Sequence, residues 1–220
     1  MGSKKISFIT SVNDDELYNE CLRYIFSLNI PDGYEIETIC MRNTKSMTSA
    51  YNEGMNHTNA KYKVYLHQDT YIINKNFIYE ILDIFNNSDI GMIGLIGADE
   101  MPINGIWWDS ISRYGSVYES SGGKIDLLSF KEIVHKYKSV KAIDGLIMIT
   151  QYDLPWRDDI FDGWHFYDIS QCFEFLNKGY SVVIPKQDEV WCIHDCGIAN
   201  IENGYEKYRQ RFLSEYGIIK

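Results

Sequence analysis

The sequence predicts a single α/β domain built on a mostly parallel, twisted sheet with helices on its faces. Two observations indicate this class. Short apolar runs of strand length alternate with segments whose apolar residues recur at helical spacing, and no repeat or low-complexity linker divides the 220 residues. Strands joined by helices pair in parallel through right-handed crossovers. We therefore expect one domain over residues 1–200, with residues 201–220 forming a C-terminal helix packed on it.

The first half of the chain shows the alternation most clearly. Apolar runs predict strands at residues 6–12, 34–40, 62–66 and 90–96, and helical spacing predicts helices at residues 46–55 and 76–85. Another helix should follow the first strand, because Asn13 can cap it and Asp14, Asp15 and Glu16 place negative charge in its first turn.

The second half is less regular. Residues 97–127 contain glycines, serines and two adjacent tryptophans without a helical period, which predicts a long functional loop or a hairpin that the pattern does not resolve. Strands are expected at residues 140–150, 181–184 and 190–193, a helix at 169–176, and a tail helix from the spacing of Ile201, Tyr205, Tyr208, Phe212 and Tyr216.

Composition excludes several classes of function. The net charge of -10 argues against a nucleic-acid backbone as partner, and an anionic substrate would need a cation or a cluster of donors. No run approaches the ~18 to 20 apolar residues of a membrane span, and the N-terminus lacks the apolar region of a signal peptide. The five cysteines include no C-x-x-C pair, which suits free thiols in a reducing compartment. We expect a soluble, cytoplasmic protein; peripheral membrane association and the oligomeric state stay open.

The segment KYKVYLHQDT at residues 61–70 carries the clearest chemical signal. A buried strand runs directly into His67, Gln68 and Asp69, and the end of such a strand is where open α/β sheets bind ligands. His67 and Asp69 are two residues apart, so an extended backbone points both to one side. The pair can hold a metal ion, or a phosphate through one, although a polar loop after a strand explains the same residues.

Other candidate residues each have a structural alternative. Cys192, His194 and Cys196 alternate along a strand and could bind zinc, which needs a fourth ligand. Asp168 lies among aromatic residues, where a raised pKa would suit a general base, but it could equally be a carboxylate stabilised at a helix start. Trp107 and Trp108 could stack on a sugar or simply pack.

The order of several segments resembles a known family. Along the chain come SFITSV, AYNEG, YKVYLHQDTYI, DGLIMIT, FDGWHFYDISQCFEFLNKGYSVVIP and a histidine near Gly197. Together they resemble a bacterial glycosyltransferase of the family-two kind, which has the Rossmann-like GT-A fold. More narrowly, they resemble the glycosyltransferase-like branch in which His-Gln-Asp replaces the Asp-x-Asp metal motif. The similarity covers residues 6–197.

The resemblance implies a role for individual residues. Asp168 matches the general base. Donor binding falls to Ser11, Val12, Asn13, Arg42, Tyr51, Asn52, His67, Gln68 and Asp69; acceptor binding falls to Trp107, Trp108, Asp144, Gly145 and Trp164; and the metal ligands are His67, Asp69 and His194. Relatives end the second strand with an acidic residue that reads uracil, whereas this chain has Arg42, so the nucleotide stays open.

The activity implied is hexosyl transfer from a nucleotide-diphospho-sugar to an acceptor hydroxyl, with inversion, a Mn²⁺ or Mg²⁺ cofactor, and a place in bacterial polysaccharide biosynthesis. Residues 97–127 would then form a lid that donor binding orders. The alternative is a non-catalytic protein of the same fold that binds a sugar nucleotide or a glycan. A nucleotidylyltransferase is disfavoured, because no glycine-rich, basic loop follows the first strand.

Overall fold

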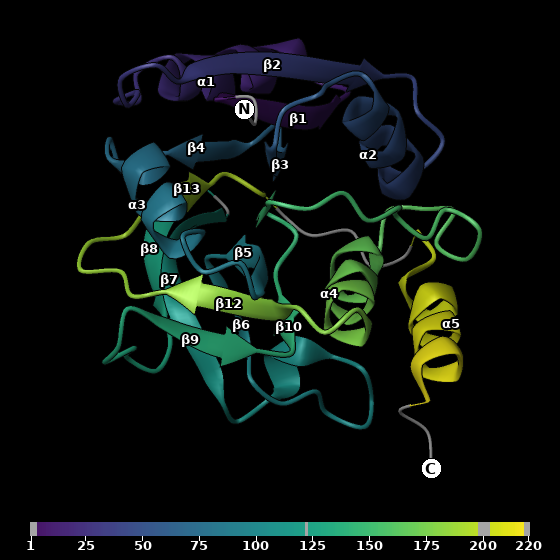
Figure 1. The fold of residues 1–220 in the computed structure, drawn as a ribbon. Coiled ribbons are helices and arrows are strands. Elements are labelled where there is room, and N and C mark those ends of the chain that lie inside the picture. Colours follow the sequence, from purple (N-terminus) through teal and green to yellow (C-terminus); the bar gives the residue numbers. More distant parts are fainter. Residues whose placement is uncertain (1–3, 122, 198–202, 218–220) are drawn as a thin grey trace.

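The computed structural model describes residues 4–121, 123–197 and 203–217, which form two sheets with helices around them (Figure 1). The strands are β1 (Lys5–Val12), β2 (Glu35–Arg42), β3 (Tyr62–His67), β4 (Thr70–Ile72), β5 (Ile90–Gly94), β6 (Ile96–Ala98), β7 (Arg113–Ser121), β8 (Lys124–Ser129), β9 (Tyr137–Val140), β10 (Ala142–Ile143), β11 (Ile147–Thr150), β12 (Ser181–Pro185) and β13 (Cys192–His194). The helices are α1 (Asp15–Ile25), α2 (Met47–Asn56), α3 (Phe77–Ile84), α4 (Tyr167–Asn177) and α5 (Tyr205–Tyr216), with a 3₁₀ turn at Trp107–Asp109.

The larger sheet has seven strands in the order β2-β1-β3-β11-β5-β12-β9. The predicted α/β class is confirmed, but the sheet is mixed instead of mostly parallel. β1 is parallel to β2 and β3, and β12 is parallel to β5, whereas β11 runs antiparallel to both β3 and β5. Two neighbouring strands can run parallel only if a long crossover, usually a helix, connects them. The described chain between β5 and β11 forms no α-helix, which agrees with their antiparallel pairing.

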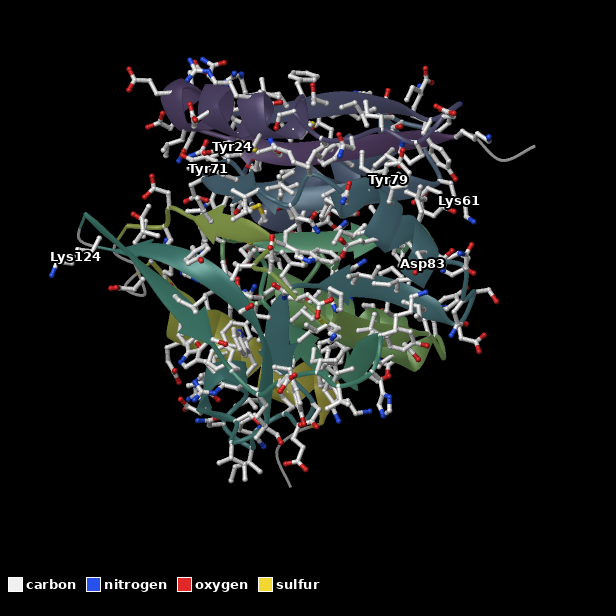
Figure 2. The ribbon with its side chains drawn as sticks, turned by 90° about the vertical axis from the view of Figure 1, so that its left-hand side faces the viewer. Tyr24, Lys61, Tyr71, Tyr79, Asp83 and Lys124 are labelled. Carbon is white, nitrogen blue, oxygen red and sulfur yellow. The ribbon has the colours of Figure 1, made fainter. Side chains whose placement is uncertain are left out.

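A second sheet, which the sequence did not predict, has the strand order β10-β6-β7-β13-β4, with β8 paired to β7. The antiparallel hairpin of β7 and β8 occupies much of the segment 97–127, so the expectation of a long irregular loop is wrong and the hairpin alternative is right. Lys124 marks the tip of this hairpin, which projects from the body of the molecule (Figure 2). Most of β8 is exposed, so its sequence lacks the apolar alternation that marks a half-buried strand.

Alternate side chains of β1 enter two hydrophobic cores on opposite faces of the larger sheet. Ile6 and Phe8 pack with buried residues of α1 and α3, whereas Ile9 packs with Tyr51 of α2 and Tyr65 of β3. Figure 1 accordingly shows α1 and α3 on one side of the molecule and α2 and α4 on the other. At the edge of the first core, Tyr24 of α1 stacks on Tyr71 of β4, as Figure 2 shows.

Helix α5 packs on α4 as expected of the tail helix. The Phe212 ring contacts the rings of Phe166 and Phe173, and Arg157 forms ion pairs with both Glu174 of α4 and Glu215 of α5. The expected contribution of Ile201 and the boundary at residue 200 lie outside the described residues. Among those that are described, no helix is both long and apolar enough to span a bilayer.

Candidate functional site

A cleft of about 400 Å³ opens where β1 and β3 end. The two strands are parallel neighbours, so their carboxyl ends meet at one edge of the sheet, which is the ligand-binding edge of open α/β folds. The cleft is lined by Ser11, Val12, Asn13, Asn43, Thr44, Met47, His67, Gln68, Asp69 and Trp164. The polar triplet that the sequence placed at the end of a strand therefore faces a cavity.

Gln68 ties the two strand ends together. Its side-chain oxygen accepts hydrogen bonds from the backbone N–H groups of Asn13 (2.9 Å) and Asp14 (3.0 Å), and its amide nitrogen donates to the Asn13 side chain (2.6 Å). Because the Asn13 side chain is engaged in this way, Asp14 caps helix α1 by accepting from Glu16 and Leu17, which corrects the predicted cap by one residue. Gln68 thus holds the rim of the cleft in shape.

His67, Asp69 and His194 bring their ligand atoms within 4.8 Å of one another. His194 lies 127 residues from His67, and it arrives because β13 pairs with β4, which places His194 opposite Thr70. The Asp69 Oδ1 atom is 3.6 Å from His194 Nε2 and 3.9 Å from His67 Nδ1, and the two ring nitrogens are 3.4 Å apart. Ligand atoms bound at about 2.1 Å from one ion lie roughly 3 to 4 Å apart, so this spacing suits a shared cation.

The electrostatics of this group also favour a cation. Only 14 to 25% of each of the three side chains is exposed, and Asp69 Oδ1 is buried without a hydrogen-bond partner among the described residues. Burial raises the pKa of Asp69, and the neighbouring His194 opposes that shift. Burial, followed by the effect of His194, lowers the pKa of His67 to about 4, so its ring is neutral near pH 7 and keeps a lone pair for a metal. A buried, unpaired carboxylate beside imidazoles is the donor set that a divalent ion would satisfy.

Tyr167 orients His67 from the opposite side. The Tyr167 hydroxyl is hydrogen-bonded to His67 Nε2, which leaves Nδ1 facing Asp69 and His194. A ring that binds a metal through Nδ1 carries its proton on Nε2 and donates it to the phenol oxygen. This contact depends on Gly145, since a Cβ atom there would lie 2.2 Å from the Tyr167 hydroxyl oxygen.

A second cleft, of about 270 Å³, adjoins the first and shares His67 and Trp164 with it. Its remaining lining residues are Trp108, Asp144, Gly145, His165, Phe166, Tyr167, Asp168, Ile169 and Tyr205. Phe166 has a positive φ of 62°, an unusual conformation for an aromatic residue, and helix α4 begins directly after it. This sharp turn places Asp168 in the first helical turn beside the cleft.

The surroundings of Asp168 disfavour its ionised form. Burial, followed by the negative charge of Asp144, raises the pKa of Asp168 to about 7, against the opposing effect of nearby backbone N–H groups. Asp162, which like Asp144 precedes a glycine, is exposed and lines neither cleft. Tyr208 and Arg211 donate hydrogen bonds to its carboxylate and lower its pKa.

Comparison with known proteins identifies the family of this chain. The sequence profile described as a glycosyltransferase-like family matches residues 7–216, nearly the whole chain. The chain belongs to this glycosyltransferase-like family. None of the curated proteins compared matches the sequence.

Solved structures of GT-A enzymes share the fold of this glycosyltransferase-like chain. The mannosyltransferase of Pyrobaculum calidifontis, in complex with GDP-Man and Mn²⁺, is 10% identical and superposes with a TM-score of 0.61 over 100% of this chain and 66% of its own. Staphylococcus aureus TarS with UDP is also 10% identical (TM-score 0.56, 95% of this chain, 65% of its own). A Drosophila β-1,4-galactosyltransferase 7 mutant with manganese, UDP-Gal and xylobiose is 12% identical (TM-score 0.53, 92% and 73%). The chain therefore spans about two thirds of the length of the first two.

Four residues predicted to contact ligands in this glycosyltransferase-like chain line neither cleft, and the burial of Tyr51 and Trp107 argues against their direct contact with a ligand. Tyr51 is buried between Tyr65 and Trp156, and Asn52 hydrogen-bonds the backbone of Trp156 in both directions (2.9 and 2.8 Å). Trp107 is buried in the core, and the Arg42 side chain forms an ion pair with Asp15. Apolar burial accounts for the placement of Tyr51 and Trp107, hydrogen bonds with Trp156 account for that of Asn52, and the carboxylate of Asp15 accounts for that of Arg42.

The structure also adds residues that the sequence did not single out. Asn43 and Thr44 line the first cleft after the end of β2, and the rule that strand ends line ligand sites could have found them. His165 and Tyr205 line the second cleft. The spacing of Tyr205 in the sequence predicted only that it packs in the tail helix. It contacts the His165 ring in the folded chain, and because the two residues are far apart in sequence, no local pattern indicates this contact.

Proposed function

We propose that this chain transfers a hexosyl group from a nucleotide-diphospho-sugar to an acceptor hydroxyl, with inversion at the anomeric carbon. The observation that carries the proposal is the junction of the two clefts at His67 and Trp164. On one side of this junction lies a buried carboxylate without a hydrogen-bond partner among the described residues, Asp69, and on the other lies Asp168, whose pKa is about 7. A donor in the first cleft and an acceptor in the second would meet there.

The first cleft suits the donor. The nucleoside would lie beside Ser11, Val12 and Asn13, with its diphosphate toward Asp69. Two of the structures that share the fold are complexes with GDP-Man and UDP-Gal, which supports a nucleotide-sugar donor here. The end of β2 has Arg42 in place of the acidic residue that reads uracil in relatives, so the identity of the nucleotide base must be determined by experiment.

His67, Asp69 and His194 would hold the divalent cation. Two imidazoles with one carboxylate favour Mn²⁺ over Mg²⁺, which prefers oxygen ligands. When bound, the cation would neutralise charge on the leaving diphosphate, which a protein of net charge -10 needs.

The second cleft suits the acceptor. Asp168 would accept the proton of the acceptor hydroxyl while that oxygen bonds to the anomeric carbon and the bond from this carbon to the diphosphate oxygen breaks. Trp108 and Trp164, both partly exposed, offer faces on which a sugar ring of a glycan acceptor can stack. The five free cysteines support a cytoplasmic location as part of the proposal.

A donor screen tests the proposal. Thermal unfolding with UDP-, GDP-, CMP- and dTDP-sugars, each with and without Mn²⁺, should show one nucleotide that stabilises the protein by mass action and does so more strongly with metal. The stabilising donor should then be consumed, by hydrolysis or by transfer to added glycans. Stabilisation without any consumption would support a non-catalytic sugar-nucleotide-binding protein instead.

Tyr167→Phe should weaken the affinity for Mn²⁺ about 10- to 100-fold, because the His67 N–H then loses the partner that orients the ring. Calorimetric titration of Mn²⁺ into the wild-type and variant proteins measures this effect. The phenylalanine ring keeps the aromatic contacts with Tyr51 and Trp156, so the melting temperature should change little. Tyr152→Phe, on a surface stack with Tyr180, is the matched control, and equal Mn²⁺ affinity in all three proteins would contradict the prediction.

A further inference from the structure

We propose that Glu119, His194 and Cys196 form a second metal site, suited to Zn²⁺, beside the group that contains Asp69. The three ligand atoms lie within 4.8 Å of one another, and each side chain is partly buried. The two groups share only His194. The site itself does not depend on the proposed sugar transfer, and only its consequence for Mn²⁺ rests on that proposal.

The backbone builds this site from two neighbouring strands. β13 runs parallel to β7 with His194 opposite Glu119, and the Gly197 N–H donates to the Ser120 carbonyl (3.2 Å) just beyond the strand end. The hydrogen bond from Gly197 to Ser120 holds the chain after β13 against β7. The Cys196 Sγ atom consequently lies 3.6 Å from a Glu119 carboxylate oxygen and 3.8 Å from the Ser120 carbonyl oxygen.

The chemistry of the donors distinguishes this site from the first one. Thiolate, imidazole and carboxylate are the ligands that proteins offer to zinc, and three protein ligands leave a fourth, tetrahedral position for water. A thiolate is a poor partner for Mg²⁺ and Mn²⁺, which prefer oxygen. Binding of Zn²⁺ would release the Cys196 thiol proton to solvent, and the negative charges of Cys196 and Glu119 would then balance the ion.

The structure changes the zinc ligands that the sequence suggested. Cys192 is fully buried opposite Ile72 and belongs to neither group of ligands among the described residues. β13 ends at His194, so the strand alternation that joined Cys192, His194 and Cys196 does not extend to Cys196. Glu119, contributed by the hairpin strand β7, takes the place of Cys192.

Sharing His194 has a consequence for the neighbouring group. An ion held by Glu119 and Cys196 would draw on the same imidazole that helps Asp69 to bind Mn²⁺. Zn²⁺ should therefore weaken Mn²⁺ binding by the wild-type protein, and Cys196→Ser should relieve that competition.

Cobalt titration of the full chain, without nucleotide, tests the site. Co²⁺ bound to a thiolate gives an intense near-ultraviolet charge-transfer band, which Zn²⁺ should remove by displacement. We expect the band in the wild-type protein and in Asp69→Ala, and its loss in Cys196→Ser. Loss of a residue that hydrogen-bonds a metal ligand typically lowers metal affinity roughly 10- to 100-fold. Glu119 is itself a proposed ligand, so Glu119→Gln should lower the affinity for Co²⁺ by at least that factor. Cys40→Ser, which changes a free cysteine of β2 in neither group, is the matched control and should keep the band.

The second site would be overturned if the cobalt charge-transfer band persisted in Cys196→Ser. It would also be overturned if the band were lost in Asp69→Ala but kept in Cys196→Ser. Absence of the band from wild-type protein would overturn it as well. Circular dichroism of each variant verifies that the fold is retained, and Glu119→Gln, which keeps the side-chain shape, provides the answer if Cys196→Ser fails to fold. A protein that shows the cobalt band but transfers no sugar would refute the proposed function and leave the site standing.

Discussion

Replacing Asp168 with asparagine should lower the rate of sugar transfer by about 10²- to 10⁴-fold, the usual effect of removing a general base. Asparagine keeps the shape of the side chain in the first turn of α4, so donor affinity should stay near that of the wild-type protein. Steady-state kinetics with a donor identified by the screen, together with calorimetry of donor binding, separate these two effects.

The pKa of about 7 makes the same variant informative about pH. Wild-type transfer should rise with pH and level off above about pH 7, as the carboxylate of Asp168 becomes ionised. This rise should be absent from the residual activity of Asp168→Asn. A wild-type rate that stays constant from pH 5 to 8 would contradict the role of Asp168 as base.

Stability should change in the opposite direction to activity. The unfolded chain loses the Asp168 proton near its ordinary pKa of 3.8, whereas the folded protein keeps it until about pH 7, so this group lowers folding stability as pH rises through that window. Asp168→Asn removes the cost of the buried charge. We expect it to be more stable than wild type by on the order of 1 to 3 kcal/mol above pH 7, with a smaller difference near pH 4. Urea unfolding at the two pH values measures the difference.

Two aspartates serve as controls for Asp168. Asp144→Asn changes the other carboxylate of the second cleft, and Asp162→Asn changes an exposed carboxylate outside both clefts. Asp162→Asn should transfer sugar at the wild-type rate. Full turnover by Asp168→Asn, with loss of turnover in Asp144→Asn, would move the base to Asp144.

Asp69→Ala should remove the metal-dependent part of donor binding and most of the turnover. A metal that stabilises a leaving diphosphate contributes several kcal/mol, and about 4 kcal/mol corresponds to a roughly 10³-fold loss of rate. Because Asp69 Oδ1 is buried without a hydrogen-bond partner among the described residues, the variant should unfold no earlier than wild type when no metal is present. Wild type alone should then gain stability on addition of Mn²⁺ and nucleoside diphosphate.

Calorimetry of the nucleoside diphosphate with and without Mn²⁺ decides this prediction. Asp188→Asn, an exposed aspartate paired with Lys186, is the matched control and should keep the wild-type coupling between metal and nucleotide. Equal diphosphate affinity with and without Mn²⁺ in wild type would remove the metal from the proposed mechanism. His194→Ala should reduce the coupling in the same experiment if its ring nitrogen shares the ion.

The local pattern of the sequence predicted a substantial part of this protein. Strand-length apolar runs and helical spacing predicted the α/β class and most elements of the first half, because side-chain periodicity follows directly from backbone geometry. The abrupt end of an apolar run predicted that His67 and Asp69 face a ligand site, and both line the first cleft. The aromatic surroundings of Asp168 predicted a raised pKa, and its pKa of about 7 leaves the group partly protonated near neutral pH.

Long-range strand pairing decided the rest, and no local period encodes it. Pairing of β13 with β4 brings His194 to Asp69, and pairing of β13 with β7 brings Glu119 to Cys196. Residue type alone did not separate Trp107, which fills the core, from Trp108, which lines the second cleft. The side of a strand on which a residue lies follows from its neighbours in sequence, but what it faces depends on which distant segment packs there, and only the folded chain determines that.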